Sequence, residues 1–314
     1  SVGFFDCNET GVKQCLAVGK YYLGDYDFRT YWPNGTFRWG AGTHDSVREI
    51  IAVDLNNDSY ENELAVAYGG DGVRWYSSNG SLINFYDPGT ESFDTVTTCD
   101  LNNDLIPEII GGTRANNVWA LFTNGSLMWS NSLIDTINEV HCGDVNGDLV
   151  NDIIVAESSE RLVVLFGQNG SVMWNTSTDT NIASVNFIDL DNDGIKDEII
   201  SGGTSGPGEI FAYNSSGEIE LLWGFDSFTS TGGGRDFFVG DLDQDGFEDD
   251  FAVVAPGEDL FVFSANMTNI TLLWNKLYTN ANYSNYVYAS DITDDGKLNL
   301  VSGGTDGIVN MYDE

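Results

Sequence analysis

A short acidic segment recurs along the chain at a nearly constant interval, and this repeat constrains the fold more than any other feature. Its copies start at Asp6, Asp54, Asp100, Asp144, Asp189, Asp241 and Asp291. Subtracting successive numbers gives intervals from 44 residues (Asp100 to Asp144) to 52 residues (Asp189 to Asp241). An interval of this length accommodates four short strands and their turns, which is one blade of a β-propeller. The seven copies therefore predict an all-β fold, a single seven-bladed β-propeller over residues 1–314.

Each copy shows the same order of expected elements. A first apolar strand precedes the acidic segment, and a second, such as Glu198-Ile199-Ile200, follows it. A Gly-rich turn, a third strand, an Asn-Gly turn typical of hairpins and a fourth strand complete the blade. The expected blades are residues 1–45, 46–93, 94–137, 138–181, 182–232, 233–283 and 284–314. The fourth strands carry large aromatic side chains that we expect to pack between blades; these are Trp39, Trp129, Trp174, Trp223 and Trp274.

The last copy contains only three of the four expected strands, the third being Ile308 to Tyr312. Its outer edge is therefore expected to be open. Truncation or a three-stranded blade explains this pattern. A strand donated by a neighbouring chain explains it too, and such complementation would build a filament.

The repeated motif D-x-[DN]-x-D-G-x-x-D followed by an apolar strand resembles the FG-GAP/VCBS family of propellers, an architecture also found in the heads of integrin α-subunits. DLDNDGIKDEIISGG from Asp189 and DLDQDGFEDDFAVVA from Asp241 carry the motif most completely. The resemblance extends over essentially the whole chain. It implies calcium loops between the first and second strands of each blade, in a secreted or cell-surface protein.

The acidic loops also predict metal sites from their residue types alone. Counted from the first Asp, positions 1, 3, 5 and 9 offer side-chain oxygens and position 7 a backbone carbonyl, a set of oxygen ligands that Ca²⁺ prefers. We expect up to six structural Ca²⁺ ions, whereas the loop at Asp6 has a single carboxylate and is expected to be empty. The predicted ligands are Asp54, Asn56, Asp58, Tyr60 and Asn62; Asp100, Asn102, Asp104, Ile106 and Glu108; Asp144, Asn146, Asp148, Val150 and Asp152; Asp189, Asp191, Asp193, Ile195 and Asp197; Asp241, Asp243, Asp245, Phe247 and Asp249; and Asp291, Thr293, Asp295, Lys297 and Asn299.

Departures from this motif leave alternatives open. Position 6 is Gly in three loops but Ser59, Leu105 or Leu149 in others, and these residues strain the turn if that position needs a positive φ. An EF-hand is a poor match because its Glu at position 12 and its flanking helices are missing. Acidic turns without a metal remain an alternative, and Mg²⁺ fits less well because it retains more water.

The charge of the chain limits its partners. The sequence contains 49 acidic and 12 basic residues, a net charge of −37, which excludes a nucleic-acid partner because phosphate binding needs clustered cations. Such an excess repels itself, so a halophilic surface or bound metal is expected. No apolar run approaches the roughly 18 residues of a membrane span, so none is expected. Starting at Ser1 without a signal pattern, the sequence is expected to be a processed or trimmed form.

Cysteines and glycosylation sequons favour an extracellular location. A Cys7–Cys15 disulfide could replace the missing metal of the first loop. Cys99 and Cys142 are expected to point to opposite faces of their strands and to meet across blades three and four, with buried free thiols as the alternative. Turn chemistry alone could place the Asn-Gly sequons. The residues expected to be glycosylated are Asn34, Asn79, Asn124, Asn169, Asn175, Asn214, Asn266, Asn269 and Asn282.

The sequence favours binding over catalysis. Its two histidines, His44 and His141, form no recognisable triad spacing. We expect a non-catalytic extracellular or cell-surface protein with adhesive or structural work, whose partners are copies of itself, other surface proteins or glycans. A lectin or integrin-like recognition module is the alternative. A polysaccharide lyase is less favoured, although abundant carboxylates would supply its acid and base.

Overall fold

The computed structural model describes most of the chain: residues 1–11, 13–19, 28–42, 46–89, 91–178, 181–203, 209–224, 236–255, 259–266, 268–277, 284–291, 296–304 and 309–312. Every regular element in these ranges is a β-strand. No helix of the described part is long and apolar enough to cross a bilayer.

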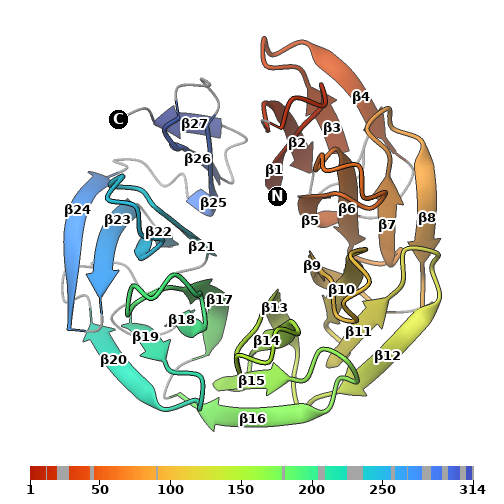
Figure 1. Cartoon of the computed structure of the whole chain (residues 1–314). Coiled ribbons are helices and arrows are strands. Elements are labelled where there is room, and N and C mark those ends of the chain that lie inside the picture. The colour runs from red at the N-terminus through yellow and green to blue at the C-terminus, as the bar shows by residue number, and fades with distance from the viewer. Residues whose placement is uncertain are drawn as a thin grey trace. The chain divides into compact units, whose positions relative to one another are not determined.

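The strands form seven antiparallel sheets in chain order (Figure 1), which confirms the predicted seven-bladed β-propeller. Six sheets have four strands and the last has three, with β27 at its edge. The first three blades comprise β1 (Val2–Phe5), β2 (Cys15–Gly19), β3 (Phe28–Tyr31) and β4 (Phe37–Ala41); β5 (Val47–Val53), β6 (Glu63–Tyr68), β7 (Val73–Tyr76) and β8 (Leu82–Tyr86); and β9 (Phe93–Cys99), β10 (Glu108–Thr113), β11 (Asn117–Leu121) and β12 (Leu127–Ser132). The other four comprise β13 (Ile137–Gly143), β14 (Asp152–Glu157), β15 (Arg161–Leu165) and β16 (Val172–Ser177); β17 (Ile182–Ile188), β18 (Glu198–Gly203), β19 (Glu209–Tyr213) and β20 (Ile219–Gly224); β21 (Asp236–Gly240), β22 (Asp250–Ala255), β23 (Asp259–Asn266) and β24 (Asn269–Leu277); and β25 (Ser284–Ser290), β26 (Asn299–Gly304) and β27 (Val309–Tyr312).

The chain divides into two compact units. The first comprises residues 1–140, 166–171 and 290–295, and the second comprises residues 141–165, 172–289 and 296–314. Among the first strands of successive blades, β1 contacts β5 and β5 contacts β9 in the first unit, and β17 contacts β21 in the second.

Burial explains the apolar pattern of the second strands. In β6, β10, β14 and β18 every residue is buried, because a strand inside a blade is covered on both faces. Outer strands such as β8 and β16 carry many exposed residues. The hydrophobic clusters join residues of consecutive blades: Phe28 with Leu64, for example, and Phe211 with Val164. The core therefore lies between blades within each unit.

The fourth-strand tryptophans confirm their predicted packing role at the blades where the structure describes them. The indole N–H of Trp39 donates to the Ser78 carbonyl of the next blade at 2.8 Å. Trp129 donates to Gly167 at 2.7 Å and Trp174 to Ser215 at 2.9 Å. The rings of Trp274 and Tyr312 lie 6.0 Å apart. The side chain of Trp223 lies outside the described set.

Blade 2 reaches the same contact by another route, since its fourth strand LINFY lacks a tryptophan. Trp75 on the third strand, β7, is fully buried and donates to the Thr123 carbonyl in the turn of blade 3 at 3.0 Å. A tryptophan N–H on a turn carbonyl of the next blade is therefore a recurring way of joining blades.

The turns that receive Trp39, Trp129 and Trp174 each contain a glycine that lies against the indole ring. A Cβ added to Gly170 would lie 2.3 Å from the Trp129 ring, and Gly170 has φ +70°. Gly35 stands in the equivalent turn of blade 1 with φ +77°, and a Cβ added there would meet no atom within 4 Å. We expect Gly170→Ala to lower the free energy of unfolding by about 1–3 kcal/mol more than Gly35→Ala. Both substitutions place an alanine at a positive φ, but only the Cβ at position 170 collides with an indole ring. Urea unfolding of the two variants measures this, and equal losses would contradict it.

Candidate metal sites

The acidic loops connect the first and second strand of each blade, and we number each loop by its blade. In loops 2–5 the carboxylate at position 1 accepts hydrogen bonds from the backbone N–H groups of positions 5 and 6. For Asp54 the donors are Asp58 at 3.1 Å and Ser59 at 2.7 Å, and Asp100, Asp144 and Asp189 repeat the pattern. Position 5 then accepts the N–H of position 7, for example Ile195 to Asp193 at 2.8 Å. These contacts curl each loop into a concavity.

The curl requires a left-handed backbone at position 6, as the sequence suggested. Gly194, Gly246 and Gly296 have positive φ there, and so do Leu105 (φ 69°) and Leu149 (φ 67°), together with Ser59 (φ 73°). Position 4 is also left-handed, which the motif did not predict; its occupants include Asn57, Asn103, Gly147, Asn192 and Gln244. Leu105 and Leu149 therefore confirm the expected strain.

Relieving this strain gives a testable prediction. The Leu149 side chain is 83% exposed, so its removal costs little buried surface. We expect Leu149→Gly to raise the free energy of unfolding by about 0.5–1 kcal/mol, because glycine adopts positive φ without a Cβ clash. The neighbouring Val150→Gly is the control and should lower it by a similar amount. Chemical denaturation tests both, and a loss of stability in Leu149→Gly would refute the strain.

A carboxylate at the start of the second strand closes loops 2, 3, 5 and 6. Glu63 accepts the N–H of Leu55 at 3.0 Å, Glu108 that of Leu101 at 2.8 Å, and Glu198 that of Leu190 at 2.9 Å. Asp250 accepts the N–H of Leu242 at 2.8 Å. In each case the donor is position 2, so this contact joins the two ends of the loop.

The sequence motif predicted this closing residue in some loops and missed it in others. Glu108 and Asp152 stand at position 9 and were predicted. Glu63, Glu198 and Asp250 stand at position 10, because loops 2, 5 and 6 contain one more residue, and they were missed. The predicted position-9 residues Asn62, Asp197 and Asp249 directly precede them. Counting backwards from the apolar second strand would have found all of them.

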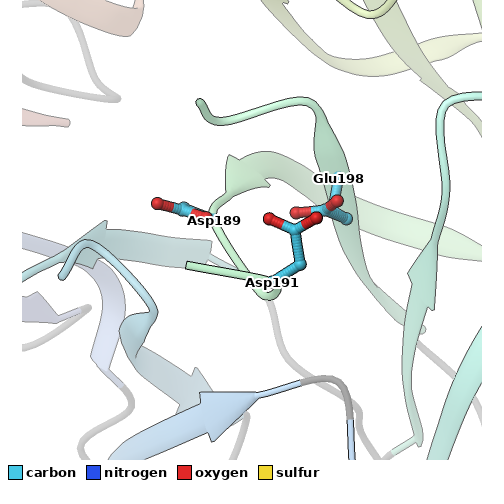
Figure 2. A group of neighbouring side chains, drawn as sticks. All are labelled: Asp189, Asp191 and Glu198. Atoms are coloured by element: carbon cyan, nitrogen blue, oxygen red, sulfur yellow. The ribbon is translucent and has the colours of Figure 1, made fainter. Parts of the chain in front are cut away.

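Two loops bring three carboxylates together. In loop 5, oxygens of Asp189, Asp191 and Glu198 all lie within 4.8 Å of one another, and Figure 2 shows Asp191 and Glu198 turned toward each other. Loop 6 groups Asp241, Asp243 and Asp250 in the same way. Both groups pair an exposed carboxylate at position 3 with a buried closing one.

Burial and mutual repulsion change the protonation of these groups. Desolvation, helped by repulsion from the neighbouring loop carboxylates and partly offset by the position-2 N–H, raises the pKa of Glu63, Glu108, Glu198 and Asp250 to about 7. The pKa of Asp249 rises to about 6 for the same leading reason. Desolvation raises the pKa of Asp197 as well. A nearby cation would stabilise the ionised form of these carboxylates.

Unpartnered oxygens identify loop 6 as the site that best fits a cation. Asp250 is fully buried and Asp249 is 4% exposed, yet no residue in the described part of the chain donates a hydrogen bond to one oxygen of each. Asp241 Oδ1 and, in loop 2, Asn62 Oδ1 are also buried without a donor. A donor set made only of oxygen suits a hard cation such as Ca²⁺. The residues present therefore fit calcium.

The first and last loops differ from the others. In loop 1, Asp6 accepts Asn8 N–H at 3.1 Å, and the Cys7–Cys15 disulfide closes the loop with Cα atoms 5.8 Å apart. Because Cys7 is position 2 and Cys15 starts β2, the covalent bond stands where other loops have the carboxylate contact. In loop 7, Thr293 and Asp295 lie outside the described residues, and Asn299 is fully buried at the start of β26.

Cys99 and Cys142 are both disulfide-bonded, and none of the four cysteines, all within the described ranges, is free. His141 lies on β13, whereas His44 and Asn282 lie outside the described residues.

Most sequon asparagines serve the turns between third and fourth strands. Each accepts the N–H of the Ser or Thr two residues later, as Asn34 does from Thr36 at 3.0 Å; Asn79, Asn124, Asn169, Asn214 and Asn266 repeat this bond. Asn175 and Asn269 lie instead on β16 and β24. Turn geometry thus accounts for these six sequons without a glycan, and glycosylation stays a prediction.

Comparison with known proteins supports the repeat and the fold. Residues 144–200 match the family model described as FG-GAP-like repeat. This segment runs from the first Asp of loop 4 into β18, so it contains two acidic loops. No curated protein matches the chain in sequence.

Similar solved structures are propellers that share 12% sequence identity with the chain. The crystal structure of BBS1N in complex with ARL6DN, soaked with lead, has a TM-score of 0.75 and covers 99% of this chain and 90% of that one. The mercury-soaked form of that complex has a TM-score of 0.71, covering 96% and 87%. The computationally designed Ika8 protein has a TM-score of 0.66, covering 99% and 82%. At this identity the likeness concerns the fold alone.

Proposed function

We propose that this seven-bladed β-propeller with FG-GAP-like repeats is a non-catalytic, calcium-stabilised protein that works outside the cell in adhesion or as a structural subunit. The observation that carries the calcium assignment is the pair of buried, unpartnered carboxylate oxygens on Asp249 and Asp250. A divalent cation would supply what they lack, and it would offset the burial and the carboxylate repulsion that raise their pKa values.

The role of calcium in this proposal is structural. Position 1 would ligate from the end of the first strand and the closing carboxylate from the start of the second, so the cation would bridge two strands of one blade. In loop 1 a disulfide bridges the same two places, which supports a bridging role for the ion. Up to six loops would bind, with loops 5 and 6 the strongest because they cluster three carboxylates each.

The same features support an extracellular location. Disulfides persist in oxidising compartments, and extracellular calcium concentrations suit a structural site of this type. Peptide mass spectrometry of the native protein tests the expected glycans, and unmodified sequons throughout would leave only their turn role.

The open edge of the last blade also supports a structural or adhesive role. In the described part of its sheet, β27 forms the edge and pairs with β26, and Met311 on it is 54% exposed. An edge strand accepts another strand through its backbone. We propose that a neighbouring copy supplies this strand and that the chain thereby assembles into filaments. Negative-stain images and light scattering in calcium test this, and monomers alone at high concentration would count against it.

A recognition module is the second candidate, and one observation favours it. A cavity of about 320 Å³ lies between loops 5 and 6, lined among others by Lys196 and Phe247. A cation, an aromatic ring and carboxylates around a pocket of this size suit a small polar ligand such as a sugar. Binding on a glycan array would favour this role over a purely structural one.

A further inference from the structure

Loops 5 and 6 touch each other through residues that neighbour the proposed calcium ligands. The backbone N–H of Asp189 donates to the Glu248 carbonyl at 3.3 Å, and the Lys196 ammonium pairs with the Glu248 carboxylate. In the amide orientation that gives both its ends a complementary partner, Asn192 donates to Asp189 O and Asp249 Oδ2, each at 3.2 Å. We call these contacts the loop 5–6 clamp.

The clamp contacts one predicted calcium ligand from each loop, Asp189 of loop 5 and Asp249 of loop 6. Asn192 occupies the left-handed position 4 of loop 5, between Asp191 and Asp193. Its amide reaches Asp249, whose other oxygen is buried without a donor. Movement of Asp249 toward a cation in loop 6 would therefore act directly on the backbone turn that shapes loop 5.

Loops 1 and 2 contain the same contact, but loop 1 is not one of the proposed calcium sites. The N–H of Asp6 donates to the Glu61 carbonyl at 2.9 Å, and Lys13 pairs with Glu61. Lys13 and Lys196 both stand at position 8 of their loops, as do Glu61 and Glu248 of the loops that follow. Loop 1, however, is closed by a disulfide. This pair provides a natural reference in which one loop is permanently ordered.

We propose that loops 5 and 6 bind Ca²⁺ with positive cooperativity and that Asn192, Lys196 and Glu248 are the positioning residues that couple them. The inference rests on the proposed calcium sites. A cation in loop 6 fixes Asp249 and Glu248, and through them Asn192 and Asp189. Loop 5 then loses less conformational entropy when it binds, so its affinity rises, and the coupling is reciprocal.

Hydrogen–deuterium exchange of the whole chain, measured against free Ca²⁺, reports each loop separately. Asp243→Asn disables loop 6 through an exposed side chain, and we expect the calcium midpoint of protection in loop 5 to rise by about fivefold or more. Asp191→Asn should raise the loop 6 midpoint by the same factor. In the Asn192→Ala/Lys196→Met background, Asp243→Asn should leave the loop 5 midpoint unchanged.

The matched control is Lys13→Met, which breaks the corresponding ion pair of loops 1 and 2. It should leave the loop 2 midpoint unchanged, because the disulfide keeps loop 1 ordered. The coupling is wrong if Asp243→Asn leaves the calcium midpoint of loop 5 unchanged in the otherwise unmodified protein. It is also wrong if Asp243→Asn still shifts that midpoint in the Asn192→Ala/Lys196→Met background. Either result would leave the proposed calcium sites themselves intact. Absence of calcium-dependent protection in every loop would instead overturn the proposed function.

Discussion

Removing divalent cations with EDTA is expected to lower the Tm by about 8 °C or more. A site held at about 100 times its Kd contributes ~2.7 kcal/mol, so loops 5 and 6 together contribute about 5 kcal/mol. Unfolding entropy near the Tm is about 2.1 cal/mol/K per residue, so each kcal/mol shifts the Tm of a 314-residue chain by roughly 1.5 °C. Scanning calorimetry in calcium and in chelator measures the difference.

Paired variants separate specific binding from a general charge effect. Asp191→Asn combined with Asp243→Asn removes one ligand from each cluster and should abolish most of the calcium-dependent rise in Tm. Asp87→Asn combined with Glu218→Gln removes the same charge from exposed positions outside the loops and should retain it. An identical Tm in calcium and chelator, with no metal found by elemental analysis, would falsify the assignment.

Acidification is expected to stabilise the metal-free protein, which is opposite to the behaviour of most folded proteins. The pKa values of Glu63, Glu108, Glu198 and Asp250 rise to about 7, above those of the same groups in the unfolded chain. Their contribution is therefore fully present below about pH 4 and is lost as the pH rises through about 7. Between pH 7.5 and pH 5.5 in chelator, the free energy of unfolding should increase by a few kcal/mol.

Calcium should remove or reverse this dependence of stability on pH, because the cation stabilises the ionised carboxylates and competes with protons. Glu198→Gln combined with Asp250→Asn should reduce the pH slope in chelator, since these side chains stay neutral. Asp87→Asn combined with Glu218→Gln should retain the slope. Stability that falls steadily from pH 7.5 to 5.5 in chelator would show that the closing carboxylates are not protonated on folding.

The architecture was predictable because a blade is a local unit. Four strands joined by short turns pair with their sequence neighbours, so the interval between acidic segments revealed the number of blades. The open edge of the last blade and the disulfide at Cys7 and Cys15 followed from the same comparison of repeats. Residue types at loop positions 1, 3 and 5 suggested the metal sites.

The closing carboxylates were harder to predict from the sequence. Loops 2, 5 and 6 contain one residue more than loops 3 and 4, so a fixed spacing from the first Asp ended one residue early. Glu198 and Asp250 look like ordinary polar residues beside Asp197 and Asp249. Their importance comes from burial at the start of the second strand, and burial depends on the neighbouring blade.

The sequence by itself determined the number of blades, the order of strands and the loops that gather carboxylates, since all of these depend on contacts within one repeat. Tertiary structure decided how the blades meet: that Trp129 needs Gly170, that Trp75 replaces a missing fourth-strand tryptophan, and that Asn192 reaches Asp249. These contacts join residues roughly one repeat apart. Their geometry follows from how two blades pack against each other, which no spacing along the chain specifies.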